Sequence, residues 1–237
     1  MKYASATYVE ETRIGFVFLR THTWQHHVLR VAINDLKRLA GEPVPQGGTL
    51  LDVGCGQGRS FRYLRDVFAP TRMLGLDADP HSIDLSREET AREGIDVELF
   101  TSDCARIDLP DASVDTVFCH QTFHHLVEQE RALDEFWRVL KPGGLLLFAE
   151  STKAYIDSWV IRWFFRHPMH VQKTADEYVA MLRARGFVFT DAQVSLPYLW
   201  WSRAKDFGLL ERWGIKAAPP VGKREETLVN VAARKPG

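Results

Sequence analysis

The chain has 237 residues, which is enough for one α/β domain with elaborations and a sizeable buried core. Lysine and arginine total 30 against 31 for aspartate and glutamate, so the net charge of −1 favours no general attraction to nucleic acid. The 3 cysteines form no C-x-x-C pair, and there is neither an apolar signal core nor an apolar run of about 18 residues. These features argue against a disulfide scaffold, a zinc ribbon and a transmembrane helix, and they predict a soluble protein of the reducing cytoplasm.

Residues 1–48 precede the first predicted strand. Apolar side chains recur at helical spacing from about Thr21, and Gly41 fits the end of that helix. One interpretation of this segment is a helix that simply covers the sheet. His22 and His26 lie four residues apart, as pairs of metal ligands do. Because no third carboxylate or cysteine stands near them at ligand spacing, we expect no metal site.

A glycine-rich loop after an apolar run organises the rest of the chain. Asp52 lies near the end of the run, and Gly54, Gly56 and Gly58 follow at alternate positions before a polar segment that can open a helix. Glycines allow a backbone to turn sharply and approach a ligand without a Cβ in the way. The spacing is G-x-G-x-G, with arginine at position 59, and so differs from the G-x-G-x-x-G of a dinucleotide site.

Acidic residues also end the next two apolar segments. Asp77 lies 19 residues after Gly58, the distance at which a second parallel strand delivers a carboxylate to ribose hydroxyls. Asp103 follows the run at 97–100. Periodicity and capping residues predict the remaining elements. The expected helices are 59–68, 80–93, 127–140 and 174–185, and the expected later strands are 114–119, 145–149, 187–194 and 227–233.

Together these segments resemble the class I S-adenosylmethionine-dependent methyltransferases, whose first motif is an acid followed by x-G-x-G-x-G. The resemblance covers residues 50–150, including the helix-to-strand connection at 135–144. It implies an α/β, three-layer Rossmann-like methyltransferase fold, with a seven-stranded, mostly parallel sheet and an antiparallel last strand. Residues 1–48 would be the N-terminal helical lid or cover, and 49–237 the methyltransferase domain.

The same resemblance implies S-adenosyl-L-methionine as cofactor and S-adenosyl-L-homocysteine as product. In the family the acid of the first motif orders the loop, the glycines pass beneath the methionine part, the second acid binds the ribose and the third accepts from the adenine amine. The backbone carbonyl at position 120 would bind the cofactor's amino group. The residues assigned to the cofactor are Asp52, Gly54, Cys55, Gly56, Gly58, Asp77, Ala78, Asp103, Cys104 and His120.

Candidates for catalysis stand at the ends of the fourth and fifth strands. Methyl transfer is an in-line displacement, so positioning supplies much of the catalysis and a base is needed only for a protonated, weakly acidic nucleophile. His124, His125 and Glu150 lie at the sheet edge where ligands bind, and we favour His124 as the base. The alternatives are that a histidine packs inward and that Glu150 is a solvated strand end.

Beyond Glu150 the resemblance thins, and two elaborations, 151–173 and 196–226, are expected to hold the substrate. Tyr155, Trp159 and Trp163 repeat every four residues, so in one helix they would share a face. That face is core, an apolar pocket, or a membrane-contacting surface flanked by arginines. The second elaboration adds Tyr198, Trp200 and Trp201.

We therefore expect methyl transfer to a small-molecule acceptor that is apolar, aromatic or lipid-like. A methyltransferase acting on RNA or protein is an alternative, but residues 119–123 lack the N/D-P-P-Y/F pattern of enzymes that methylate base amines, and the charge is balanced, so no nucleic-acid partner is expected. A non-catalytic cofactor-binding module is the other alternative. Peripheral membrane contact is compatible with the sequence, which carries no signal for oligomeric state.

Overall fold

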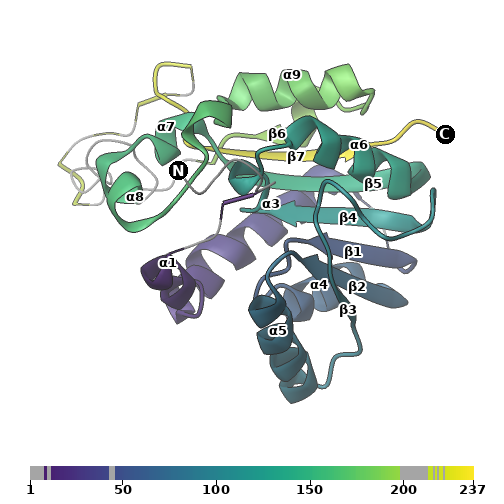
Figure 1. The fold of residues 1–237 in the computed structure, drawn as a ribbon. Helices are drawn as coiled ribbons and strands as arrows, with labels where there is room; N and C mark the ends of the chain where they lie inside the picture. The colour runs from purple at the N-terminus through teal and green to yellow at the C-terminus, as the bar shows by residue number, and fades with distance from the viewer. Residues whose placement is uncertain are drawn as a thin grey trace.

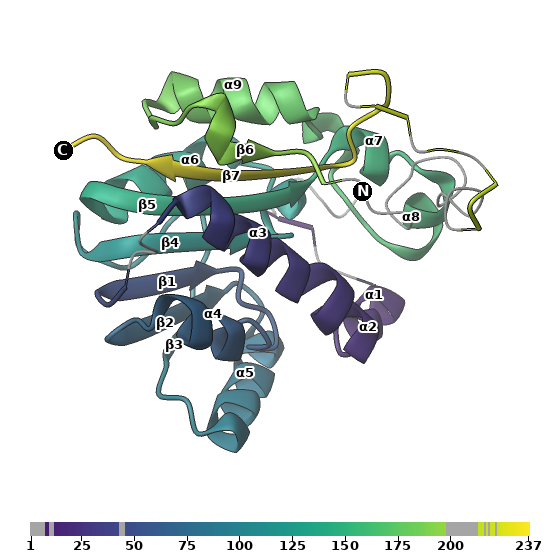
Figure 2. The same cartoon turned by 180° about the vertical axis from the view of Figure 1, so that it is seen from behind.

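A seven-stranded sheet forms the centre of the molecule, with helices on both faces (Figures 1 and 2). The computed structural model describes residues 8–9, 12–42, 46–197, 213–215, 217, 219–220 and 222–237. The strands are β1 (Thr49–Val53), β2 (Arg72–Asp77), β3 (Glu98–Thr101), β4 (Val114–His120), β5 (Leu140–Ser151), β6 (Val194–Ser195) and β7 (Leu228–Arg234). Their order is β3-β2-β1-β4-β5-β7-β6, parallel from β3 to β5, with β7 antiparallel to both of its neighbours. The predicted fold class is confirmed.

The helices begin and end close to the predicted positions. α5 starts after Asp79, whose carboxylate accepts from the backbone N–H groups of His81 and Ser82, and Gly94 ends it. The helices are α1 (Arg13–Phe18), α2 (His22–Trp24), a π-helical stretch (Gln25–Leu29), α3 (Arg30–Ala40), α4 (Phe61–Phe68), α5 (Pro80–Glu93), α6 (Gln129–Val139), α7 (Lys153–Ile156), α8 (Trp159–Phe164) and α9 (Ala175–Arg185). Short 3₁₀ turns lie at Phe123–His125, Met169–Val171 and Asp191–Gln193. Within the described ranges, no helix combines the length and apolarity needed to cross a bilayer.

The core consists of two layers because successive side chains of a strand point to opposite faces of the sheet. On β5, Leu145 and Leu147 pack with α3 and α4, whereas Leu146 and Phe148 pack with α6 and α9. Both faces are thus covered, which explains the continuous apolar run of β5. Since α3 packs on the sheet, this part of the N-terminal region serves as a cover of the sheet face.

The strand order reverses between β1 and β4, and ligands of open α/β sheets bind outside the carboxyl ends of strands at such a point. The glycine loop follows β1, and the loop 120–125 follows β4. In both views α1, α7 and α8 gather at one end of the sheet (Figures 1 and 2). Thr12 before α1 donates its hydroxyl to the carbonyl of Phe164 in α8 at 2.6 Å, which joins these two segments.

Two predictions about the later part of the chain are wrong. The strand expected over 187–194 is reduced to a bridge between Val188 and Arg234 and to the short β6, because Thr190 and Gln193 form a capping box that turns 191–193 into a 3₁₀ turn. The residues Tyr155, Trp159 and Trp163 do not all lie in one helix. Ser158 caps a new helix, α8, by accepting from the N–H of Ile161.

The exposure of the two tryptophans overturns their interpretation as core. Trp159 is 59% exposed and Trp163 is 79% exposed, and their rings contact each other edge to face. Tyr155, in α7, is largely covered. The aromatics predicted at 198, 200 and 201 lie outside the described residues.

Candidate functional site

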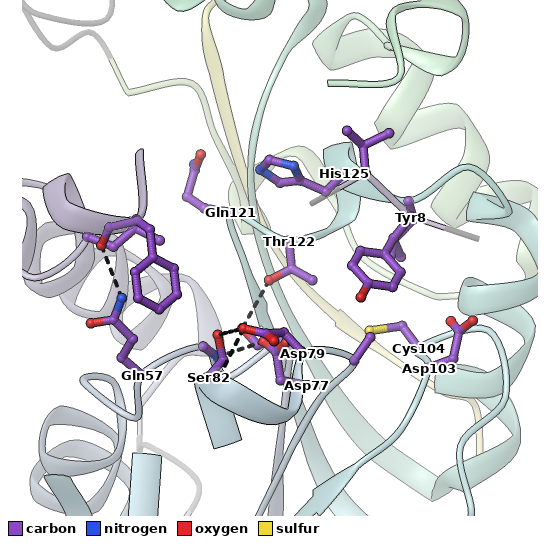
Figure 3. A pocket seen from close by; sticks show the side chains of 17 residues that line it. Tyr8, Gln57, Asp77, Asp79, Ser82, Asp103, Cys104, Gln121, Thr122 and His125 are labelled. Atoms are coloured by element: carbon purple, nitrogen blue, oxygen red, sulfur yellow. Dashed lines mark hydrogen bonds between the residues drawn. The ribbon is translucent and has the colours of Figure 1, made fainter. Parts of the chain in front are cut away.

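Three adjoining cavities lie at the carboxyl ends of β1 and β4. The main cavity, of about 290 Å³, lies between the glycine loop, the end of β2, the loop after β3 and the loop after β4 (Figure 3). The inner cavity, of about 80 Å³, reaches Asp52 and His120 beside the glycine loop. The aromatic cavity, also of about 80 Å³, lies between the loop after β4 and helices α1, α7 and α8. Leu19 and Gln121 line all three.

The structure brings most of the residues predicted to bind a cofactor to the first two cavities. Those at the main cavity are Gly54, Gly56, Asp77, Ala78, Asp103 and Cys104. Those at the inner cavity are Asp52, Gly54, Cys55, Gly56 and His120. Gly58 lines neither, and a Cβ there would press on Ser86 of α5, so this glycine allows the loop and the helix to pack closely.

The glycine loop is fixed by its backbone and by Asp77. The N–H of Gly56 donates to one carboxylate oxygen of Asp77 at 2.9 Å, and the N–H of Asp79 donates to the other at 2.9 Å. Gly54 has φ +70°, and a Cβ there would clash with the side chain of Thr122. Gly56 has φ +53°, and nothing lies within 4 Å of the position a Cβ would take. The loop therefore presents open backbone to the cavities.

Asp77 combines burial with these backbone donors. Burial raises the pKa of its carboxyl, the hydrogen bonds from Asp79 and Gly56 oppose the rise, and the net direction is upward. Figure 3 places its side chain beside those of Asp79 and Ser82 at the base of the main cavity. Asp103, on the other side of that cavity, accepts from the N–H of Ala105 at 2.8 Å, which fixes the loop after β3.

Asp52 is buried under the glycine loop and accepts a hydrogen bond from the hydroxyl of Ser60. Burial raises the pKa of Asp52 to about 7; the Ser60 hydroxyl opposes this rise, and the nearby charge of Asp77 adds to it. Cys55, Cys104 and Cys119 are all buried free thiols. Burial raises their pKa values well above the ordinary value, which keeps them unreactive.

The N-terminal segment lines the main cavity through Tyr8, Val9, Phe16 and Leu19. Val9 donates its N–H to the carbonyl of His125 at 3.0 Å. The side-chain amide of Gln57, in the glycine loop, donates to the carbonyl of Phe16 at 3.1 Å (Figure 3). The N-terminal segment, which is far from these loops in sequence, is thereby hydrogen-bonded to the loop after β4 and to the glycine loop.

His124 and Glu150 form a buried pair behind the aromatic cavity. His124 is 3% exposed and Glu150 is 0% exposed, and Nδ1 of His124 lies 2.6 Å from Oε2 of Glu150. The other oxygen of Glu150 accepts from the N–H groups of Thr122 at 2.9 Å and Phe123 at 2.8 Å. Burial alone would raise the pKa of Glu150, but the contact with His124 and these backbone donors lower it. Glu150 is therefore a buried carboxylate, and its interpretation as a solvated strand end is wrong.

The two other histidines of this loop occupy different cavities. His125 lines the main and aromatic cavities, and burial followed by the charges of His124 and His167 lowers its pKa well below the ordinary value. His120 faces the inner cavity, where burial lowers its pKa to about 4. Its Nε2 atom is buried and has no hydrogen-bond partner among the described residues.

Sequence reasoning missed several cavity residues. Gln121 has φ +53°, which is uncommon for a residue with a side chain, and its side-chain amide oxygen, Oε1, accepts from the hydroxyl of Ser151 at 2.6 Å. Its position between the strand end and His124 was the available signal. Tyr8 and His167 gave no comparable signal, because neither lies in a motif and each reaches the site only through the tertiary structure.

Comparison with known proteins identifies the domain. Residues 51–148 match the family model described as a methyltransferase domain. The chain is 31% identical over 120 residues to the demethylmenaquinone methyltransferase of Deinococcus radiodurans (50% of this chain, 50% of the relative) and 30% identical over 131 residues to a fatty-acid O-methyltransferase of Mycolicibacterium smegmatis (55% and 47%). A SAM-dependent methyltransferase structure from Aquifex aeolicus superposes with a TM-score of 0.64 at 22% identity, over 93% of this chain and 97% of that one. Residues 51–148 therefore match a methyltransferase domain, and the fold is consistent with that of a class I Rossmann-like methyltransferase.

S-adenosylmethionine is the cofactor of this methyltransferase domain, and the cavities fit it. Gly56 leaves open backbone, Asp77 offers a carboxylate in the main cavity, and Nε2 of His120 offers a polar atom without a protein partner in the inner cavity. The chain spans about half the length of the curated relatives it matches, at 50% and 47%. The names of these relatives agree on methyl transfer and differ in the acceptor.

The first prediction concerns Asp77 as the ribose-binding carboxylate. Asp77→Ala should weaken binding of S-adenosylmethionine at least tenfold, about 1.4 kcal/mol, because hydrogen bonds from hydroxyls to a carboxylate are charge-assisted. Isothermal titration calorimetry measures the affinity, and a melting curve separates this effect from loss of the glycine loop. Asp84→Ala, which removes an exposed carboxylate of α5 paired with Arg87, is the control and should bind normally. Unchanged affinity in Asp77→Ala would rule out the ribose contact.

The second prediction concerns the protonation of Asp52. Its folded pKa of about 7 exceeds the ordinary value of 3.8, so between these values the folded state holds a proton that the unfolded state has lost. This contribution to stability is complete below pH 4 and is lost as the pH rises to about 7. The melting temperature of the wild type should therefore fall relative to that of Asp52→Asn between pH 5 and pH 8. A difference that stays constant over this range would show that Asp52 is not protonated in the fold.

Proposed function

We propose that the protein transfers the methyl group of S-adenosylmethionine to a small apolar, aromatic or lipid-like acceptor that binds in the aromatic cavity. The observation that carries this proposal is the connection between two cavities of different character. The main cavity suits the cofactor, and the aromatic cavity adjoins it through Leu19, Gln121 and His125. A nucleophile in the second cavity would face a methyl group presented from the first, as an in-line displacement requires.

The lining of the aromatic cavity supports an acceptor with rings or alkyl chains. Apolar side chains from α1, α2, α7 and α8 surround it, among them Phe18, Trp24, Tyr155, Ile161 and Phe165. Polar groups reach it mainly from the loop after β4 and from His167. An apolar wall with a few convergent polar groups is typical of small-molecule sites.

His124 is the best-placed side chain to activate a hydroxyl acceptor. Because Glu150 engages Nδ1, the remaining ring nitrogen, Nε2, is the one that could take a proton at the aromatic cavity. The buried carboxylate fixes the ring and would stabilise the imidazolium that forms. Glu150 lies behind His124 and holds its ring, so we assign Glu150 a positioning role. His125 lines both the main and the aromatic cavities, and we assign it a role in positioning the acceptor beside the cofactor.

The N-terminal segment acts in this proposal as a cover over the bound cofactor. Val9 is hydrogen-bonded to the loop after β4 and Phe16 to the glycine loop, and both residues line the main cavity. Phe18 contacts Phe165 edge to face with centroids 6.1 Å apart, which extends the cover to the aromatic cavity. Closure of this kind excludes water from the reacting groups.

Two of the relatives support an apolar acceptor. One carries the name of a demethylmenaquinone methyltransferase and another that of a fatty-acid O-methyltransferase, both of which name apolar or long-chain compounds. Balanced charge continues to argue against RNA as the acceptor. Methylation of a peptide or RNA in preference to small apolar compounds in an acceptor screen would contradict the proposal, and so would cofactor binding without any turnover.

The third prediction tests His124. His124→Ala should lower the rate of methyl transfer roughly a hundredfold or more, while the affinity for S-adenosylmethionine stays constant, because a proton acceptor acts only in the chemical step. Glu150→Gln should lower the rate in the same direction by leaving the ring without its charged partner. His27→Ala, which changes an exposed histidine of the π-helical stretch, is the control. If His124→Ala has a lower melting temperature but an unchanged rate of methyl transfer, the side chain contributes only to packing.

The fourth prediction compares two aromatics from the same stripe. Tyr155→Ala should raise the acceptor's Michaelis constant several-fold or more without changing cofactor affinity, because Tyr155 lines the aromatic cavity and a buried aromatic contact contributes about 0.5–1.5 kcal/mol beyond its area. Trp163→Leu is the matched control, since its ring is exposed and is not part of that cavity's lining. Its melting temperature and solution kinetics should match the wild type. Equal Michaelis constants in all three proteins would place the acceptor elsewhere.

A further inference from the structure

Three histidines converge on the aromatic cavity. His124 and His125 come from the 3₁₀ turn after β4, and His167 comes from the segment that follows α8. The ring centroids lie 4.4 Å apart for His124 and His125, 5.1 Å for His124 and His167, and 4.7 Å for His125 and His167. Each ring offers one nitrogen such that the three atoms all lie within 4.8 Å of one another.

Buried hydrogen bonds hold this cluster together. Gln172 is buried, and its side-chain amide donates to the carbonyl of His124 at 2.8 Å and to that of Pro168 at 3.1 Å. This amide joins the segment that carries His167 to the turn that carries the other two histidines. Glu150 holds Nδ1 of His124, which fixes the orientation of that ring and leaves Nε2 for another partner.

This is the arrangement that protein metal sites use. A histidine ligand almost always has its second ring nitrogen bound to a carboxylate, a carbonyl or water, which orients the ring and raises its basicity. Glu150 supplies such a carboxylate, and its own second oxygen is in turn held by two backbone N–H groups. The cluster thus has three ligand atoms and a supporting layer behind one of them.

We propose that His124, His125 and His167 bind a first-row transition-metal ion of the zinc type, with its fourth coordination position open to the aromatic cavity. Three imidazoles favour Zn²⁺, Co²⁺ or Ni²⁺ over Mg²⁺ and Ca²⁺, which prefer oxygen ligands. In tetrahedral coordination with Zn–N distances near 2.0–2.1 Å, the ligand nitrogens stand about 3.3 Å apart. Side-chain rotations that draw the three nitrogens together by roughly 1.5 Å at the widest pair would therefore complete the site.

An ion with an open fourth coordination position could activate the acceptor for methyl transfer, and this part of the inference rests on the proposed function. An acceptor hydroxyl bound to the ion loses its proton to solvent more readily, as a zinc-bound water does. The resulting oxygen attacks the methyl carbon, so that the O–CH3 bond forms while the S–CH3 bond breaks and the electron pair stays on sulfur. In the metal-loaded protein the ion would replace the free imidazole of His124 in activating the acceptor. The class of acceptor that this selects carries a hydroxyl, an enol or a carboxylate on an apolar body.

Metal binding can be measured without cofactor or acceptor. Purified protein, with any affinity tag removed, is equilibrated with Zn²⁺, desalted and analysed by plasma mass spectrometry, and Co²⁺ loading is followed by its visible absorption. We expect about one equivalent of zinc and the intense bands of tetrahedral Co²⁺. His167→Ala should weaken binding tenfold or more, and Glu150→Gln should weaken it by about 10–100-fold through the orientation of His124.

Two histidine controls exclude other sites. His170→Ala changes an exposed histidine three residues from His167, and His26→Ala removes one member of the stacked pair with His22, whose centroids lie 3.8 Å apart. Both should retain zinc as the wild type does. The proposal is overturned if the wild type retains no zinc, or if His167→Ala retains as much as the wild type while His26→Ala loses it.

The same variants separate the metal site from the proposed function. If zinc binds as expected but no small acceptor is methylated, the metal site stands and the proposed function fails. If methyl transfer occurs at full rate in metal-free protein and in His167→Ala, the proposed function stands and the ion takes no part in it.

Discussion

The buried carboxylate of Glu150 is the interaction on which the geometry of the site depends. It receives the N–H groups of Thr122 and Phe123 on one oxygen and Nδ1 of His124 on the other, so it fixes the turn after β4 from within β5. A buried charge without partners costs several kcal/mol, whereas this one is surrounded by donors. The same turn forms part of the wall of all three cavities, through Gln121, Thr122 and the two histidines. Glu150, a single side chain on the neighbouring strand, therefore fixes the turn on which the arrangement of the three cavities depends.

The cofactor half of the site could be predicted because it is encoded locally. Asp52, the alternate glycines and Asp77 each lie directly after an apolar strand, and parallel strands bring their carboxyl ends to one edge. The structure places them at the main and inner cavities, with Gly58 serving helix packing. Asp77 holds the glycine loop as well as facing the cavity, and this second contact could not be read from spacing alone.

The half of the site proposed to bind the acceptor was predictable only in outline. His124 and Glu150 were recognised as candidates from the strand ends, but their pairing depends on the register of β4 against β5. His167 and Tyr155 come from a segment without a family pattern, and the regular spacing of its aromatics was misleading because Ser158 starts a second helix. The predicted extent of strand six was wrong for a similar reason, since the local hydrogen bonds of Thr190 and Gln193 outweighed the β-propensity of the apolar residues before them.

The three buried thiols give the protein built-in reporters of its own local opening. Cys55 and Cys104 border the cavities near the ends of β1 and β3, and Cys119 lies in β4 beside Glu150. With raised pKa values and little access to solvent, they react with an alkylating reagent only when the surrounding segment opens. The alkylation rate at each sulfur, read by peptide mass spectrometry, therefore measures the opening free energy of a different wall of the site. A ligand that binds against one wall of the site should lower the alkylation rate of the cysteine behind that wall. The native cysteines can therefore report which part of the site a ligand contacts, without any introduced label.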